Sequence, residues 1–154
     1  MIGEVLTILL VEDNEDHAEL VRRSFADNHV ANTIHHVKDG EEALDYLFRR
    51  GAYSDRHSSP VPNLILLDLR LPKVDGIEVL REIKAAETLK CIPVVVLTSS
   101  SSEKDIARAY ANYANSYLVK PVDFEKFTKM MKDLGYYWLA WNKNPLKVGA
   151  PPKG

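Results

Sequence analysis

The stretch Leu-Ile-Leu-Leu-Asp-Leu-Arg-Leu-Pro, residues 64–72, decides the fold class. Its first four residues, Leu64 to Leu67, form a short apolar run that ends at Asp68. Apolar runs without polar alternation are typical of strands that helices cover on both faces, as in parallel sheets. The stretch therefore predicts an α/β fold in which Asp68 lies at the carboxyl end of a central strand.

Four more strands are expected around this one, at Leu6–Val11, Thr33–Val37, Pro93–Leu97 and Ser116–Val119. Stretches with apolar residues at helical spacing lie between the strands, and such alternation is typical of strand-helix units around a parallel sheet. The strands at 33–37 and 116–119 are less uniformly apolar than the others. We therefore expect these two strands near the edges of the sheet and the other three in its middle.

Five helices are predicted from the same spacing. Ser102, with Asp105 three residues later, resembles a capping box and marks the start of the fourth helix, and the fifth helix is expected to begin at Asp123. The residues that define the five apolar faces are Leu20, Val21, Ser24 and Phe25; Ala43, Leu44, Leu47 and Phe48; Ile77, Leu80 and Ile83; Ile106, Ala107, Tyr110 and Ala111; and Phe124, Phe127, Met130, Met131 and Leu134.

The composition indicates a globular protein without affinity for nucleic acid or membranes. The chain has 154 residues, of which 45% are hydrophobic and 27% charged, and its formal net charge of −2 gives no general attraction to either partner. Its apolar runs are far shorter than the roughly 20 residues that cross a bilayer, and its beginning does not resemble a secretory signal. The single cysteine, Cys91, has no partner for an intrachain disulfide. A cytoplasmic protein is therefore expected.

Two segments depart from the compact alternation of strands and helices. Arg49–Asn63 shows no period and contains several glycine, serine and proline residues, so it is either a binding element or a mobile insertion in a long loop. Residues 143–154 are rich in proline, glycine and lysine and are predicted to be disordered. The folded domain is expected to span residues 1–142, including an extension of the last helix.

Polar and charged side chains follow the central strands at the edge where parallel sheets bind ligands. They are Glu12, Asp13, Asp68, Thr98 and Lys120. Three converging carboxylates would repel one another, and a divalent cation with oxygen ligands would relieve that repulsion, for which Mg²⁺ is the natural candidate. Carboxylates, a metal, a lysine and a hydroxyl together predict a site for phosphoryl transfer.

Asp68 is the expected nucleophile, because it stands alone at the tip of the most apolar strand and carboxylates can form acyl phosphates. Glu12 and Asp13 are expected to hold the metal, with the backbone carbonyl of Arg70 as a further ligand. Each of these residues alone is more commonly a helix cap or a turn residue. Only their joint placement at successive strand ends points to phosphoryl transfer.

Four motifs resemble those of the receiver domains of response regulators, over roughly Leu6 to Leu134. They are Val-Glu-Asp ending at Asp13, Leu-Leu-Asp-Leu-Arg-Leu-Pro around Asp68 with Asp75-Gly76 following, Leu97-Thr98-Ser99, and Val119-Lys120-Pro121. The resemblance implies a flavodoxin-like fold, in which a five-stranded parallel sheet of order 2-1-3-4-5 is flanked by five helices.

The resemblance also implies a function and a set of site residues. Asp68 would accept a phosphoryl group from a phosphohistidine of a sensor histidine kinase, so that the protein is a signalling switch and not an enzyme. Output would pass through protein contacts or a phosphorelay, because no output domain is expected after the fifth helix. Mg²⁺ would be bound by Asp13, Asp68 and the Arg70 carbonyl, with Glu12 acting through water.

Three further residues would read the phosphoryl group. Lys120 would pair with it, Thr98 would follow it inward, and Tyr117 would be the switch aromatic whose rotation reshapes the face of the fourth helix, fifth strand and fifth helix. The bond between Lys120 and Pro121 would be a cis peptide.

Two features exceed a minimal receiver: the insertion at Arg49–Asn63 and the aromatic run Tyr136, Tyr137, Trp138 and Trp141. Both are similar to the small stand-alone regulators that accompany cyanobacterial phytochrome kinases, which form dimers. The resemblance thus implies a phytochrome kinase as partner. The aromatic run either packs back on the fold or forms a homodimer contact. Glu12 also departs from the family pattern, in which Asp is more frequent.

Two other classes of function compete with the switch. The first is an aspartate-nucleophile phosphohydrolase, but such enzymes usually carry a second Asp two residues on as general acid, where this chain has Arg70. The second is a binding module that keeps the receiver shape without phosphorylation. The intact set of site residues argues against the second class.

Overall fold

A parallel sheet, covered by helices on both faces, organises the part of the chain that the structure, a computed structural model, describes: residues 6–26, 32–55 and 57–138. Within these residues the sheet has five strands in the order β2-β1-β3-β4-β5, and all neighbours are parallel. The predicted fold class and strand order are confirmed. The strands are β1 (Leu6–Val11), β2 (Asn32–Val37), β3 (Leu64–Leu67), β4 (Val94–Thr98) and β5 (Ser116–Val119).

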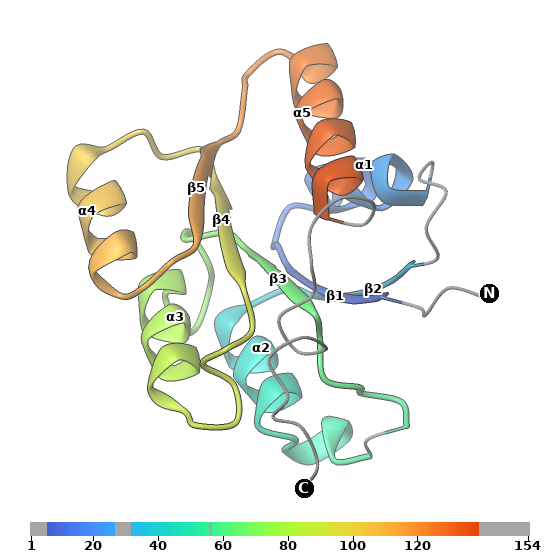
Figure 1. Ribbon diagram of the computed structural model, residues 1–154, viewed down its shortest axis with the longest axis vertical. Helices are drawn as coiled ribbons and strands as arrows, with labels where there is room; N and C mark the ends of the chain where they lie inside the picture. Colours follow the sequence, from blue (N-terminus) through green and yellow to red (C-terminus); the bar gives the residue numbers. More distant parts are fainter. Residues whose placement is uncertain (1–5, 27–31, 56, 139–154) are drawn as a thin grey trace, which may run out of the picture.

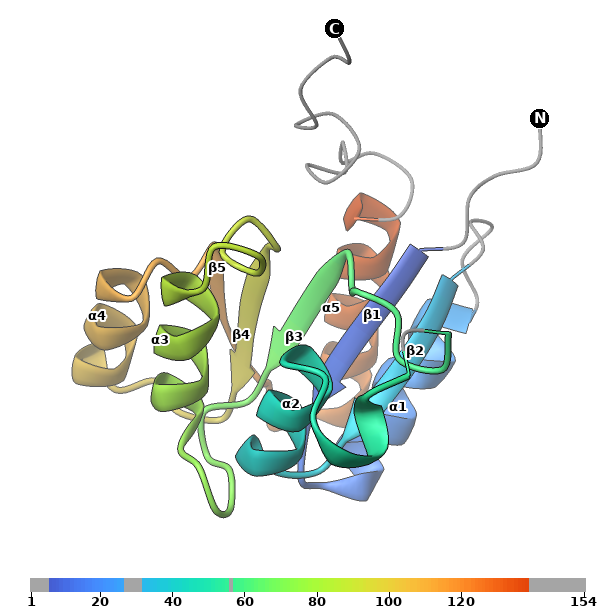
Figure 2. The same cartoon turned by 90° about the horizontal axis from the view of Figure 1, so that it is seen from below.

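Within the described residues, four α-helices connect the strands and a fifth follows the last strand. Together they form one layer on each face of the sheet (Figures 1 and 2). Helices α1 and α5 pack together on one face, and α2, α3 and α4 lie on the other. The helices are α1 (Glu15–Ala26), α2 (Gly40–Leu47), α3 (Gly76–Ala85), α4 (Glu103–Ala111) and α5 (Phe124–Tyr136), with a short 3₁₀ helix, η1, at Gly51–Tyr53.

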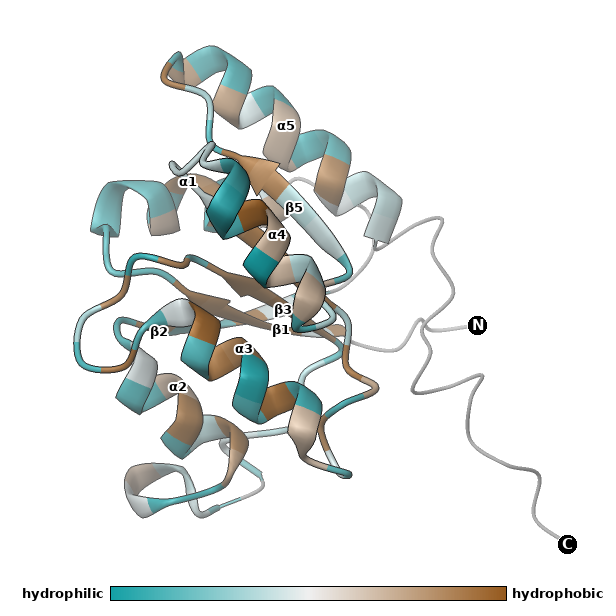
Figure 3. Ribbon diagram, turned by 90° about the vertical axis from the view of Figure 1, so that its left-hand side faces the viewer, coloured by the Kyte–Doolittle hydropathy of each residue, from teal (hydrophilic) through white to brown (hydrophobic). Residues whose placement is uncertain are grey.

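The central strands are buried because side chains alternate between the two faces of the sheet. Leu9 and Leu67 face the core under α2 and α3, while Ile8 and Leu66 face the core under α1 and α5. β1, β3 and β4 are buried almost throughout, whereas β2 and β5 are only partly buried, as expected for edges. In Figure 3 the middle strands are accordingly brown. The apolar clusters on the two faces of the sheet hold the parallel strands side by side. The carboxyl ends of the strands therefore meet at one edge of the sheet.

Helix boundaries follow the predicted caps. The Ser102 side chain accepts a hydrogen bond from the Asp105 amide, and the Asp123 side chain accepts from the amides of Glu125 and Lys126, which satisfies amides that the first helical turn leaves unpaired. α5 therefore begins at Phe124, directly after the predicted residue. None of the described helices is both long and apolar enough to cross a membrane.

The predicted apolar face of α4 is wrong. Ala109 is its one buried residue, while Ala107 and Ala111 are exposed and Tyr110 is half-exposed. The helix packs against α3 and β5 along a narrow stripe, so a single small side chain is enough to fill the contact. Figure 3 shows the resulting mixture of hydrophobic and hydrophilic residues along α4.

The apolar faces of α2 and α5 are correct except at one end of each helix. Phe48 is the residue after the last turn of α2 and is 37% exposed, and Phe124 in the first turn of α5 is 68% exposed. Phe127 and Met131 form the buried stripe of α5, with Met130 and Leu134 partly buried beside them.

The insertion Arg49–Asn63 is not wholly irregular, since it contains η1. The Tyr46 hydroxyl of α2 donates a hydrogen bond of 2.8 Å to the Pro60 carbonyl, and the Tyr53 hydroxyl donates to the Glu42 carboxylate. Tyr53 also packs against the core beneath α2. These contacts tie the described part of the insertion to α2. Whether it is a binding element or a mobile insertion stays a prediction.

Gly76 permits a close approach between the start of α3 and the chain that follows β3. A β-carbon there would lie 2.5 Å from the carbonyl oxygen of Asp68 and 2.5 Å from the α-carbon of Leu69. We expect Gly76→Ala to lower the free energy of unfolding by about 3 kcal/mol, measured by urea denaturation, because backbone atoms cannot rotate away.

Gly51→Ala is the matched control for this prediction. Nothing lies within 4 Å of a β-carbon at Gly51, although its φ of +57° is unfavourable for alanine. The control should lose only about 1 kcal/mol from backbone strain. Equal losses in the two variants would show that the close approach at Gly76 is not what limits substitution.

Candidate functional site

Three carboxylates meet at the carboxyl edge of the sheet. Glu12 and Asp13 follow β1, Asp68 follows β3, and one oxygen of each lies within 4.8 Å of one oxygen of the other two. Glu12 is 1% exposed and Asp68 6% exposed, whereas Asp13 is exposed. The amide of Asp68 donates to the Val11 carbonyl at 3.0 Å, which holds the two strand ends in register. The predicted convergence of the acidic residues is therefore present.

Lys120, at the end of β5, reaches into this cluster from the other side. Its Nζ donates to Glu12 Oε1 at 2.6 Å and to Asp68 Oδ2 at 3.1 Å, and its side chain is 3% exposed. Its backbone amide donates to the Thr98 carbonyl at 2.7 Å. The geometry thus brings Lys120 together with both buried carboxylates, as predicted.

The predicted cis peptide between Lys120 and Pro121 is wrong. No cis peptide occurs among the described residues, which include both. The lysine reaches the carboxylates with a trans bond, because the β5 register already directs residue 120 toward the edge where β1 and β3 end. Pro121 itself lies directly after the site and contributes no polar contact to it among the described hydrogen bonds.

One lysine does not neutralise this cluster. The pKa of Glu12 is raised to about 7, mainly by burial and in smaller part by the nearby Asp68 charge, although the charge and hydrogen bond of Lys120 lower it. Loss of water thus outweighs the single counter-charge at the buried Glu12 carboxylate. Three carboxylate oxygens around a partly open point are the donor set that a hard divalent cation such as Mg²⁺ prefers, so the residues fit such an ion.

Known proteins resemble this chain in both sequence and fold. The family description "Response regulator receiver domain" matches residues 8–132. The chain belongs to the receiver domain family. It is 49% identical over 138 residues to the probable methanogenesis regulatory protein FilR2 of Methanothrix harundinacea, covering 90% of this chain and 86% of that one. It is 42% identical over 132 residues to the response regulator Rcp1 of Synechocystis sp., covering 86% of this chain and 88% of Rcp1.

Solved structures agree with the family. The crystal structure of the phosphorylated cyanobacterial phytochrome response regulator RcpA superposes with a TM-score of 0.88 at 40% identity, covering 92% of this chain and 99% of RcpA. The Mn²⁺-bound form of Rcp1 superposes with a TM-score of 0.86 at 41% identity, covering 91% of this chain and 99% of that one. This receiver is therefore similar along nearly its whole length to stand-alone phytochrome response regulators.

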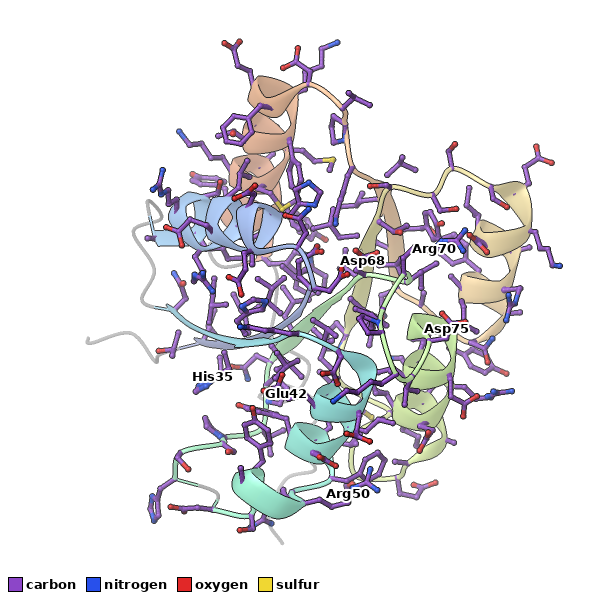
Figure 4. All side chains as sticks on the ribbon, turned by 180° about the vertical axis from the view of Figure 1, so that it is seen from behind. His35, Glu42, Arg50, Asp68, Arg70 and Asp75 are labelled. Atoms are coloured by element: carbon purple, nitrogen blue, oxygen red, sulfur yellow. The ribbon has the colours of Figure 1, made fainter. Side chains whose placement is uncertain are left out.

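A second network connects the receiver's Asp68 to α4 and β5. Arg70 lies close to Asp68 in the loop after β3 (Figure 4), and its amide donates to Asp68 Oδ1 at 3.2 Å. The Arg70 guanidinium donates to Asp105 Oδ2 at 2.8 Å. The Ser100 hydroxyl donates to the same Asp105 oxygen at 2.6 Å, and the Tyr117 hydroxyl donates to the Ser100 carbonyl at 2.9 Å. Hydrogen bonds through Arg70, Asp105 and Ser100 thus connect Asp68 with α4 and β5. Thr98, at the end of β4, is fully buried below this network.

Two histidines beside the buried carboxylates and Lys120 also escaped sequence reasoning. The Nδ1 atom of His17 lies 3.0 Å from Lys120 Nζ, and His36 Nε2 donates to the Glu12 carbonyl at 2.7 Å. His17 could have been found, because it lies one helical turn after Asp13 and the first turn of α1 begins at the edge where the site forms. His36 carried no such signal, since only the pairing of β1 with β2 brings it to Glu12.

Proposed function

We propose that this receiver is a single-domain phosphorylation switch whose phosphoacceptor is Asp68. A carboxylate oxygen of Asp68 attacks the phosphorus of a phosphohistidine, the phosphorus–nitrogen bond breaks, and its electron pair returns to the imidazole of the sensor histidine kinase. The observation that carries the proposal is the buried Asp68 carboxylate, which Lys120 contacts at 3.1 Å within a cluster of three acids. Lys120 and a cation together offset the charge that gathers on the phosphoryl oxygens.

Mg²⁺ is the proposed cofactor, held by Asp13, Asp68 and the Arg70 carbonyl, with Glu12 acting through water. When bound, the ion lowers the repulsion between the entering phosphoryl group and the carboxylates. The exposed Asp13 leaves one side of the cluster open to solvent, as an ion that keeps several waters requires. The Mn²⁺-bound form of Rcp1 supports a divalent cation in a close relative.

The proposed output is a change in the face formed by α4, β5 and α5, read by a partner protein or passed on in a phosphorelay. A phosphoryl group brings about −1.5 to −2 units of charge. Lys120 and the Thr98 hydroxyl are proposed to contact its oxygens. The Ser100 loop, to which Tyr117 donates, would then move with Thr98, which connects the buried event to the surface.

This receiver is proposed to be cytoplasmic. Its proposed phosphodonor is a sensor histidine kinase of the phytochrome type, which the similarity to RcpA supports. FilR2 is named as a probable methanogenesis regulatory protein, whereas RcpA is a phytochrome response regulator. Phosphotransfer from purified sensor kinases of each kind would show which one phosphorylates this receiver. A homodimer through the C-terminal aromatics is also proposed. Tyr136 and Tyr137 are each 53% exposed, while Trp138 packs partly on the core; Trp141 and the predicted tail at 143–154 lie outside the described residues.

One experiment tests the proposed function. The protein is incubated with acetyl phosphate and Mg²⁺ and its intact mass is measured. We expect one added phosphoryl group, and none after chelation of the metal. Multiple turnover of phosphate esters would instead indicate a phosphohydrolase. The structure disfavours that activity, because the position two residues after Asp68 holds Arg70, which pairs with Asp105 and cannot serve as a general acid. No modification under any condition would indicate a passive binding module.

Mg²⁺ affinity should rise with pH because Glu12 titrates near neutrality. With a pKa of about 7, the Glu12 carboxyl is mostly protonated at about pH 6 and mostly ionised at about pH 8, so the affinity should increase about tenfold between them. The measurement is calorimetric titration with Mg²⁺. Glu12→Gln should remove most of this pH dependence. An affinity that is unchanged over this range in the natural protein would contradict the prediction.

The raised pKa of Glu12 has the opposite effect on the metal-free protein, whose stability should fall as the pH rises. The pKa of Glu12 is higher in the folded state than its ordinary value of 4.5, so folding binds a proton. The contribution of Glu12 to stability is full below about pH 4.5 and is lost as the pH rises through about 7. Added Mg²⁺ should therefore stabilise the fold more at about pH 8 than at about pH 6.

A further inference from the structure

The Lys120 ammonium has three N–H groups, and it lies near three acceptors from three separate parts of the chain. Glu12 Oε1 at 2.6 Å and Asp68 Oδ2 at 3.1 Å are carboxylates, and the third acceptor is the Nδ1 atom of His17 in α1, at 3.0 Å. The lysine side chain is only 3% exposed, so its ammonium depends mainly on acceptors from the protein. His17 therefore completes the hydrogen bonding of a buried charge.

Nδ1 of His17 can accept from an ammonium only when it carries no proton, which places the ring proton on Nε2. Burial lowers the pKa of His17, as does the charge of Lys120, while the carboxylates of Asp68, Asp16 and Asp13 oppose this. The neutral ring is thus favoured. It acts as an acceptor without adding another charge to the acidic cluster.

The position of the His17 ring is set from two sides. The Asn14 side chain accepts from the His17 amide at 3.0 Å, which fixes the first turn of α1. The ring also meets the buried Phe127 ring of α5 edge-on, with 5.3 Å between centroids. Packing of α1 on α5 therefore holds Nδ1 toward Lys120.

His17 differs from Glu12 and Asp68 because neither a cation nor a phosphoryl group would compete with Lys120 for its ring nitrogen. A bound cation draws on the oxygens of Glu12 and Asp68, and phosphorylation converts the Asp68 carboxylate into an acyl phosphate. Nδ1 of His17 already points at the ammonium and is not among the acidic groups that gather around the metal position. Of the three acceptors, His17 is thus the one that neither a cation nor a phosphoryl group would engage directly.

We propose that His17 is a positioning residue that anchors the Lys120 ammonium, so that the N–H released by Asp68 turns to a phosphoryl oxygen. The inference rests on the proposed phosphorylation of Asp68 and extends it to α1. Without His17 the ammonium would shift toward the carboxylates and the rate of phosphorylation would fall.

The test compares two substitutions with opposite properties. His17→Leu keeps an apolar side chain against Phe127 but has no acceptor, whereas His17→Asn is shorter but places Oδ1 close to the position of Nδ1. With acetyl phosphate and saturating Mg²⁺, we expect the Leu variant to be phosphorylated about tenfold more slowly at saturating phosphodonor, with unchanged Mg²⁺ affinity, and the Asn variant to recover most of the rate. If packing alone mattered, the order of the two variants would be reversed, which would overturn the proposal.

His35→Leu is the control, because His35 packs against Tyr46 and lies away from Lys120; its rate should be unchanged. Nitrogen NMR of the His17 ring should show the proton on Nε2, and a proton on Nδ1 would also overturn the proposal. Natural protein that is never phosphorylated would refute the proposed function at Asp68 instead. Equal rates in the natural protein and His17→Leu would refute the role of His17 alone.

Discussion

Asp68→Asn is expected to abolish the gain of a phosphoryl group while leaving the fold intact. An amide has no anionic oxygen to attack phosphorus, so the acyl phosphate cannot form. The substitution keeps the shape of the side chain, and its oxygen can still accept from Lys120, which retains Glu12 as a second acceptor. Intact mass after incubation with acetyl phosphate and Mg²⁺ should equal that of the untreated variant.

Asp75→Asn is the matched control for this variant. Asp75 also follows β3 in the chain and lies at the start of α3 (Figure 4). It is exposed, however, and its side chain makes no capping hydrogen bond. The control should gain one phosphoryl group at the natural rate. Phosphorylation that persists in Asp68→Asn would place the acceptor on another residue.

Asp68→Asn should also be more stable than the natural protein when metal is absent. Removing the Asp68 charge leaves Glu12 paired with Lys120 and takes away a charge that raises the pKa of Glu12. Thermal denaturation at about pH 8 without Mg²⁺ should show a higher midpoint. A variant that loses activity but gains stability would show that the repulsion between Asp68 and Glu12 destabilises the natural protein and is needed for phosphorylation.

The central sheet could be predicted because its signal is local. β1 and β3 have the predicted bounds, since unbroken apolar runs are rare outside doubly covered strands. The convergence of Glu12, Asp68 and Lys120 then followed from one rule, that parallel strands end at the same edge. Their separations of 2.6 to 3.1 Å depend on side-chain packing, which no spacing rule gives.

The features that sequence reasoning missed depend on contacts between distant elements. Spacing marks four apolar residues on α4, but only Ala109 is buried, because burial depends on how closely the helix approaches α3 and β5. The link from Arg70 to Asp105 crosses from the loop after β3 to α4 and has no local pattern. The contact between His17 and Lys120 joins residues more than 100 positions apart for the same reason.

Lys120→Met should destabilise the metal-free protein strongly at about pH 8. Methionine keeps an unbranched side chain of similar length but removes the charge that Glu12 and Asp68 share. Breaking a buried ion pair from one side typically costs about 3 kcal/mol or more, and we expect a loss of that size in urea denaturation. Lys129→Met is the control, because its ion pair with Asp133 lies on the exposed face of α5 and should matter little.

The loss should shrink under two conditions that relieve the same repulsion. Lys120 lowers the pKa of Glu12, so its removal raises that pKa further, and at about pH 5 protonation of Glu12 should recover part of the stability. Mg²⁺ should recover stability at about pH 8 by replacing the missing positive charge. Phosphorylation should stay slow even with Mg²⁺, because the ion cannot donate the hydrogen bond that the lysine supplies. Full recovery of the rate together with the stability would mean that Lys120 serves the fold and not the phosphoryl group.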